Sequence, residues 1–365
     1  MNDVLAKAKR IVFKIGSSTL LEETGHIDGP GLHHLVALWS NLHKSGKEII
    51  LVSSGAVALG RPHLSSDHKG NAIPSKQAAA AVGQSKLMAL YDSFFSVCGI
   101  SVAQVLLTRG DIADRQRYIN ARNTLNILLN EGIIPIINEN DTVAWEELKF
   151  GENDSLAALV GNLLDADLVF LLSDIYGLYT DDPRKDPSAK HISVVKEITP
   201  EISALAGGVG SSVGSGGMKS KVEAAHIAVQ SGIPLAITMG KDVQNIQNCL
   251  EADGKCTVFL PSDHGLRQRD RWLAYASEPS GCILIDEGAA CALNKNKSLL
   301  PVGIVGVKGD FTENSVVTVV CTNGKTIARG ITNYSSDTIR DTMGKHCSDA
   351  DICEVIHCDN MVMEE

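Results

Sequence analysis

The chain has 365 residues, a formal net charge of −10 and a hydrophobic content of 44%. This length is typical of about two domains, and the composition is that of an ordinary globular protein with a real core. The acidic balance argues against a general affinity for nucleic-acid backbones or anionic membranes, although it leaves room for a small basic pocket. Because neither a secretory signal nor a run of roughly 18 apolar residues is visible, we expect a cytoplasmic protein without a membrane span.

Apolar segments alternate with helical patterns over the first 260 residues. Strands are predicted at residues 10–13, 48–52, 102–107, 133–137, 167–172 and 233–238. Helices are predicted at residues 32–44, 75–97, 112–129, from 155 onwards, 218–230 and 243–250. A hairpin or excursion is expected at 192–198, and an edge strand at 256–260. Nearly continuous apolar strands that alternate with helices predict an α/β fold, a three-layer αβα sandwich around a mostly parallel sheet.

Polar side chains follow several of the predicted strands. Lys14 comes directly after three apolar strand residues, where a lysine is unfavourable unless it reaches a ligand or a carboxylate. Residues 138–141 (NEND) end another strand, and Glu152, Asn153 and Asp154 open a helix. Each cluster alone is equally compatible with a turn or a helix cap. Together they indicate a ligand site along the carboxyl edge of the sheet.

A glycine-rich segment, residues 207–217, precedes the helix that begins at Met218. Such loops bind phosphate because glycine lets the backbone approach and the helix start offers N–H groups. A flexible surface loop is the alternative, but Lys219 and Lys221 in the first helical turn oppose the helix dipole unless an anion lies there. Lys14 and Lys221 are therefore predicted to meet at one transferring phosphoryl group. The Walker, dinucleotide-binding and protein-kinase motifs are missing from the sequence, so those classes are disfavoured.

Seven motifs together resemble the amino acid kinase family, and within it the glutamate 5-kinases. They are KIGSS at 14–18, VSSGA at 52–56, NEND at 138–141, GEND at 151–154, SD at 173–174, GLYTDDPR at 177–184 and SGGMKSK at 215–221. The resemblance implies transfer of the ATP γ-phosphoryl group to the γ-carboxylate of L-glutamate, the first step of proline synthesis. It also implies Mg²⁺, held mainly through the ATP phosphates and not by a metal site of the protein.

The same resemblance implies roles for individual residues. The catalytic set is Lys14, Lys221 and Asp154, the last holding the two lysines in place. The glutamate-binding set is Ser54, Gly55, Asp141 and Asn153, with Asp141 paired to the substrate ammonium. The ATP-binding set is Lys14, Gly16, Ser173, Asp174, Ser215, Gly216, Gly217, Met218, Lys219, Ser220 and Lys221. Serine stands at 53, 173, 215 and 220 where the family commonly has threonine, which keeps each hydroxyl.

The C-terminal part has a different composition. Short strand-like segments at 282–285, 303–307, 315–320 and 326–330 follow a linker at 263–279, which carries Arg267, Arg269 and Arg271 beside Trp272. We therefore predict a kinase domain at 1–262 and a small β-rich domain at 280–365 that resembles PUA domains. Twelve acidic and seven basic residues give this domain a net charge of −5, which disfavours RNA binding. The cysteines clustered at 347–358 fit no common zinc finger, and reduced thiols are the simpler interpretation.

Three functions remain open at this point: a glutamate kinase, a related kinase for another carboxylate or carbamate, and an RNA-binding protein with an inactive kinase fold. The family resemblance adds further expectations, namely feedback inhibition by proline, a homodimer or homotetramer, and association with glutamyl phosphate reductase.

Overall fold

The computed structural model describes residues 2–22, 24–65, 72–144, 153–206, 217–261, 279–295, 297–345 and 354–363. The chain forms two compact units, which are considered separately below. Among the described residues, none of the helices combines the length and the apolar character that crossing a membrane requires. The predicted linker at 263–279, with its arginines, lies outside the described residues apart from Pro279.

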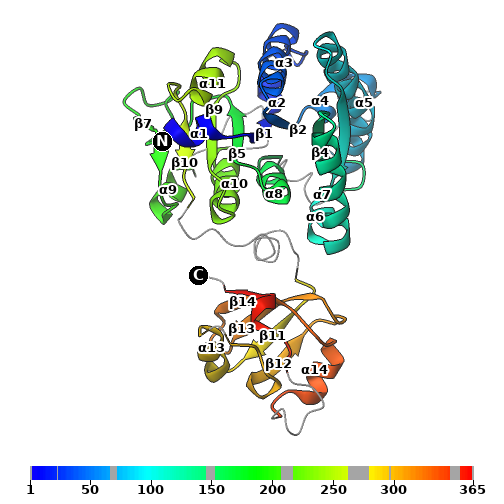
Figure 1. Cartoon of the computed structure of the whole chain (residues 1–365), viewed down its shortest axis with the longest axis vertical. Coiled ribbons are helices and arrows are strands. Elements are labelled where there is room, and N and C mark those ends of the chain that lie inside the picture. Colours follow the sequence, from blue (N-terminus) through cyan, green and yellow to red (C-terminus); the bar gives the residue numbers. More distant parts are fainter. Residues whose placement is uncertain are drawn as a thin grey trace. The chain divides into compact units, whose positions relative to one another are not determined.

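The first unit is built on an eight-stranded sheet in the order β3-β4-β2-β1-β5-β9-β10-β8 (Figure 1). All neighbouring strands are parallel except β9 and β10. The prediction of a mostly parallel sheet is therefore confirmed. The strands are β1 Arg10–Ile15, β2 Glu48–Ser53, β3 Val102–Leu107, β4 Ile134–Glu139, β5 Leu168–Ser173, β8 Val194–Val195, β9 Leu235–Met239 and β10 Thr257–Phe259.

The edge beyond β9 differs from the expectation. Strand β7 (His191–Ile192) pairs with β6 (Leu178–Tyr179) in a separate two-stranded ribbon, so 192–198 forms no hairpin of its own. Strand β8 instead pairs with β10, which makes β8 the edge strand and places β10 inside the sheet. Strands of two or three residues carry too little periodicity for their partners to be read from the sequence.

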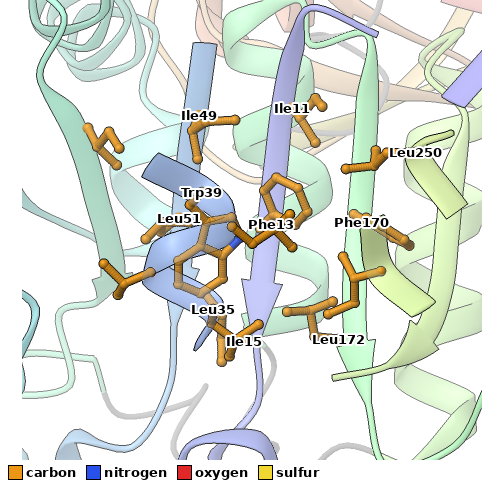
Figure 2. Close-up of a cluster of buried hydrophobic side chains, with 14 of the residues drawn as sticks. Ile11, Phe13, Ile15, Leu35, Trp39, Ile49, Leu51, Phe170, Leu172 and Leu250 are labelled. Atoms are coloured by element: carbon orange, nitrogen blue, oxygen red, sulfur yellow. The ribbon is translucent and has the colours of Figure 1, made fainter. Parts of the chain in front are cut away.

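One face of the sheet is covered by α3 (Gly29–Lys44), α5 (Ile73–Val97) and α11 (Val243–Leu250), which share a continuous core with alternate strand residues. Figure 2 shows part of this core, with these side chains labelled: Ile11, Phe13, Ile15, Leu35, Trp39, Ile49, Leu51, Phe170, Leu172 and Leu250. The opposite face is covered by α8 (Asn153–Leu164) and α10 (Met218–Gln230) (Figure 1). Helices on both faces confirm the three-layer architecture.

Strand alternation decides where Lys14 points. Successive strand side chains point to opposite faces of a sheet, and Phe13 and Ile15 lie in the α3 core. The side chain of Lys14 therefore lies on the face covered by α8, which packs directly against β1.

The remaining helices of this unit are short, apart from α7. The predicted helix at 112–129 is two helices, α6 and α7, because the helical pattern is interrupted at Asp114. Helices α2 and α4 follow β1 and β2 and were not predicted. Their bounds and those of the other elements are α1 Asn2–Lys7, α2 Ser17–Leu20, α4 Ala56–Gly60, η1 Arg61–His63, α6 Arg109–Ala113, α7 Arg115–Asn130 and α9 Pro200–Leu205.

The second unit contains a five-stranded sheet in the order β12-β11-β13-β14-β15, with a small apolar core of its own. The four predicted strands are present, whereas the last strand and two helices were not foreseen. The elements are β11 Gly281–Ile285, α13 Glu287–Leu293, η5 Pro301–Gly303, β12 Ile304–Lys308, β13 Val316–Cys321, β14 Thr326–Ile331, α14 Ser336–Thr342, η6 Cys358–Asn360 and β15 Met361–Met363. The cysteines at 347 and 353 lie outside the described residues.

Candidate active site

Four neighbouring parallel strands, β4, β2, β1 and β5, end at the same edge of the large sheet. The carboxyl ends of parallel strands meet at one edge, which is where ligands bind in open α/β sheets. Lys14 lies in β1, Ser53 closes β2, Asn138 lies near the end of β4, and Ser173 closes β5. The predicted gathering of polar strand ends is thus present.

A buried ion cluster lies at this edge, centred on the carboxylate of Asp154. Nζ of Lys14 is 2.7 Å from Oδ1 of Asp154, and Nζ of Lys221 is 3.3 Å from Oδ2. Asp154 is the second residue of α8, while Lys221 lies in the first turn of α10. Asp154 is 1% exposed and both lysines are 7% exposed. Two lysines that are far apart in the sequence therefore converge on the two oxygens of one carboxylate.

The carboxylate of Asp154 is ionised although it is buried. Burial opposes ionisation of Asp154, but Lys14, Lys221 and a hydrogen bond from Ser220 hold its pKa well below the ordinary value. The Ser220 hydroxyl is 2.8 Å from Oδ2 of Asp154 and 2.9 Å from the carbonyl oxygen of Gly217. Among the described residues, two ammonium groups thus face the two oxygens of one buried carboxylate. Two ammonium groups held side by side suit an anion that offers several oxygens.

A glycine lies just beyond the end of β1 and another just beyond the end of β2. A Cβ atom added to Gly16 would lie 3.6 Å from Nζ of Lys14 and 3.8 Å from the carbonyl oxygen of Leu172. Gly55 has φ of +102°, a left-handed conformation that favours glycine, and it directly precedes α4. Glycine at 16 thus keeps the space beside the Lys14 ammonium free of a side chain, and glycine at 55 allows the left-handed backbone.

The residue before Asp154 belongs to a neutral network. Nδ2 of Asn153 donates to the carbonyl oxygen of Ser53 at 2.8 Å, to Oγ of Ser54 at 3.0 Å and to Oδ1 of Asn138 at 2.9 Å. Nδ2 of Asn138 in turn donates to Oε1 of Gln84 at 2.9 Å. Gln84 did not figure among the predicted site residues. The available signal was a polar side chain on the buried face of a long, alanine-rich helix.

Comparison with known proteins gives the family of this chain. The amino acid kinase family model matches residues 9–239. The chain belongs to the amino acid kinase family. A model of the PUA domain matches residues 281–352 of the second unit.

Within this family, the chain is similar over its whole length to curated glutamate 5-kinases. It is 46% identical to glutamate 5-kinase of Moorella thermoacetica, over 98% of this chain and 97% of that protein. It is 45% identical to the enzyme of Geobacter sulfurreducens, over 99% of both chains, and 45% identical to that of Carboxydothermus hydrogenoformans, over 100% of both. The kinase therefore lies within the glutamate 5-kinase branch, and the alternative of an RNA-binding protein with an inactive kinase fold is not favoured.

Other site residues predicted for this kinase are placed less centrally. Asp141 is only half-buried, and burial raises its pKa to about 6. The Ser173 hydroxyl donates to Asp174 at 3.1 Å, and Asp174 also pairs with Arg184 at 3.1 Å near the surface. None of the described contacts joins these three residues to the ion cluster.

The glycine-rich loop is only partly described. Ser215 and Gly216 lie outside the described residues, whereas Gly217 precedes α10 and Met218 begins it. The side chain of Lys219 is 78% exposed, and its Nζ lies 3.8 Å from Glu223. Lys219 therefore points away from the buried cluster that Lys221 joins.

Among the described residues, the site offers few side chains that could hold a metal ion. Within the described part of the chain, we find no group of three or more His, Cys, Asp or Glu side chains arranged for a metal. The buried carboxylate of Asp154 is already engaged by two ammonium groups and a hydroxyl. The two ammonium groups suit phosphate oxygens. A divalent cation fits here only together with a nucleotide whose phosphate oxygens bind the cation.

Proposed function

We propose that this kinase transfers the γ-phosphoryl group of ATP to the γ-carboxylate of L-glutamate, giving γ-glutamyl phosphate and ADP, the first step of proline synthesis. The convergence of Lys14 and Lys221 on Asp154 carries this proposal. A carboxylate acceptor is ionised at neutral pH, so the reaction needs no general base. The main obstacle is repulsion between two anions, which the ammonium groups of Lys14 and Lys221 relieve.

Each lysine has a distinct place in this mechanism. Lys14 comes from the centre of the sheet and Lys221 from the first turn of α10, so together they reach a phosphoryl group from two elements. Asp154 keeps both amines in place before the nucleotide binds, and Ser220 holds the carboxylate. The backbone N–H groups of Gly16 and Gly55 donate to phosphoryl oxygens. Bound Mg²⁺ supplies further neutralisation of the ATP phosphates.

The acceptor lies on the β2 and β4 side of the edge. Asp141 pairs with the ammonium group of glutamate, while Ser54, Gly55 and Asn153 contact its polar groups. On the nucleotide side, the hydroxyl and carboxylate of Ser173 and Asp174, together with residues 215–221, contact ATP. Support for placing the acceptor and the nucleotide on different sides comes from the start of α8, where Asn153 joins the neutral amide network and Asp154 joins the ion cluster.

The proposal is tested by ADP release with a panel of acceptors. We expect Mg²⁺-dependent ADP release with L-glutamate, and much weaker release with L-aspartate, N-acetyl-L-glutamate or carbamate. Faster turnover of aspartate than of glutamate at equal concentration would reject the assignment of the acceptor.

Three further properties are proposed from the family alone. L-Proline inhibits the reaction by feedback, the chain assembles as a homodimer or homotetramer in the cytoplasm, and the labile acyl phosphate passes to glutamyl phosphate reductase. Proline titration in the ADP assay, light scattering and co-purification with the reductase test these points in turn.

A further inference from the structure

Three buried amide side chains form a continuous chain beneath the acceptor side of the site. They are Gln84 in α5, Asn138 in β4 and Asn153 at the start of α8, and each is at least nine-tenths buried. Asn138 donates to Oε1 of Gln84 at 2.9 Å and accepts from Nδ2 of Asn153 at 2.9 Å. Asn153 is the member of this chain that borders the proposed glutamate pocket.

The orientation of each amide follows from one backbone group. The backbone N–H of Glu139 donates to Oδ1 of Asn138 at 2.9 Å, and an N–H group can only donate. The oxygen of Asn138 is therefore fixed towards Glu139 and Asn153, and its NH₂ group is fixed towards Gln84. Gln84 must meet that NH₂ group with its carbonyl oxygen.

Only one group of the Asn153 side chain is available to a ligand. Its NH₂ group has two hydrogens, and these are shared among the Asn138 oxygen, the Ser53 carbonyl and the Ser54 hydroxyl. None of the described hydrogen bonds uses the oxygen of Asn153. Asn153 therefore presents a hydrogen-bond acceptor, which suits an ammonium group and repels a carboxylate.

Gln84 occupies a position where an apolar side chain would be expected. Its Nε2 atom is buried without a partner among the described residues, which is unfavourable. The helix is also held tightly there, because a Cβ on the adjacent Gly83 would lie 1.7 Å from the Ala56 carbonyl oxygen. A buried amide that uses only its oxygen, on a helix that cannot shift, indicates that the oxygen has a function.

We propose that Gln84 is a positioning residue of the acceptor pocket: through Asn138, it helps to hold Asn153 where its carbonyl oxygen meets the ammonium group of the acceptor amino acid. The inference rests on the proposed function, because it takes glutamate as the acceptor. Loss of the Gln84 oxygen leaves the NH₂ group of Asn138 without a partner. A buried NH₂ group without a partner is unfavourable, so the Asn138 side chain shifts, and its oxygen then holds the NH₂ group of Asn153 less firmly.

The test compares L-glutamate with glutarate, which has both carboxylates but no ammonium group. In the full-length chain, the KM for L-glutamate and the inhibition constant of glutarate are measured by ADP release for Gln84→Met and Gln84→Glu. Methionine keeps the unbranched shape without hydrogen-bonding groups, whereas glutamate keeps an oxygen for Asn138. We expect Gln84→Met to raise the KM for L-glutamate about tenfold, a ratio worth roughly 1.4 kcal/mol. The inhibition constant of glutarate should change less than twofold.

Gln84→Glu should restore most of the preference for L-glutamate. Ser85→Ala, which alters an exposed hydroxyl on the same helix, is the matched control and should leave both constants unchanged. Equal changes for glutamate and glutarate in Gln84→Met would overturn the proposal, as would an unaltered KM. If Gln84→Met does not fold, Gln84→Asn gives the same readout, because its shorter side chain cannot reach Asn138. Absence of glutamate-dependent ADP release in the unmutated chain would instead reject the proposed function.

Discussion

Two adjacent residues at the start of α8 enter networks of opposite character. Asp154 joins a charged cluster with two lysines, whereas Asn153 joins a neutral chain of amides. The charged cluster holds two ammonium groups, whose electrostatic field acts over several ångströms and needs only approximate geometry. The amide chain has no net charge and acts only through directed hydrogen bonds. This contrast fits our proposal that the first network serves phosphoryl transfer and the second serves recognition of the acceptor.

The largest expected effect comes from removing the carboxylate that the two lysines share. Asp154→Asn removes the buried carboxylate that pairs with both ammonium groups, and breaking a buried ion pair costs about 3–5 kcal/mol. We expect a loss of this size in the free energy of unfolding, measured in urea, together with loss of activity. Asn162→Asp, which adds a charge elsewhere in buried α8, is the matched comparison for general damage to this helix. Unchanged stability of Asp154→Asn would contradict the buried ion cluster.

The second effect separates catalysis from acceptor binding. Lys221→Ala removes one of the two cations that face the phosphoryl group, and loss of one such group costs roughly 10²–10³-fold in kcat. The KM for L-glutamate should change by less than about threefold, since the lysine acts most strongly in the transition state. Steady-state kinetics, with ATP and L-glutamate varied in turn, measures kcat and both KM values. A large rise in the KM for glutamate with normal kcat would place Lys221 on the acceptor side instead.

The third effect is a pH dependence of acceptor binding. Because burial raises the pKa of Asp141 to about 6, its carboxylate is ionised above that pH and protonated below it. Only the ionised form pairs with an ammonium group, so the KM for L-glutamate should rise about tenfold between pH 7 and pH 5. Asp141→Asn should have a raised KM at pH 7 that no longer depends on pH in this range. A pH profile that survives in Asp141→Asn would remove this residue from the pocket.

The smallest effect is expected at Lys219. Its side chain is 78% exposed and only loosely paired with Glu223, and such a surface ion pair contributes little to stability. Lys219→Ala should change the KM for ATP less than about twofold, whereas Lys221→Ala, two residues further on, abolishes most turnover. An effect of Lys219→Ala comparable to that of Lys221→Ala would mean that the exposed lysine contacts the nucleotide directly.

The sequence alone predicted the architecture because its evidence is local. Strand and helix periods are visible within windows of ten to twenty residues, and Val102–Leu107 and Val243–Leu250 were placed to the residue. Short strands were misplaced, since two residues such as Val194 and Val195 carry no period. The polar strand ends and Lys14 were likewise identified from their neighbours in the chain.

Only the tertiary structure decided which side chains meet. Lys14 and Lys221 are separated by most of the domain, and it is the packing of α8 and α10 on one face of β1 and β9 that brings both to Asp154. The sequence shows Gln84 as a polar residue in an alanine-rich helix, but only the structure shows that it bonds to Asn138 in the strand opposite. Patterns along the chain determine elements, but pairwise contacts between distant elements determine the orientation of an amide or the sharing of a carboxylate.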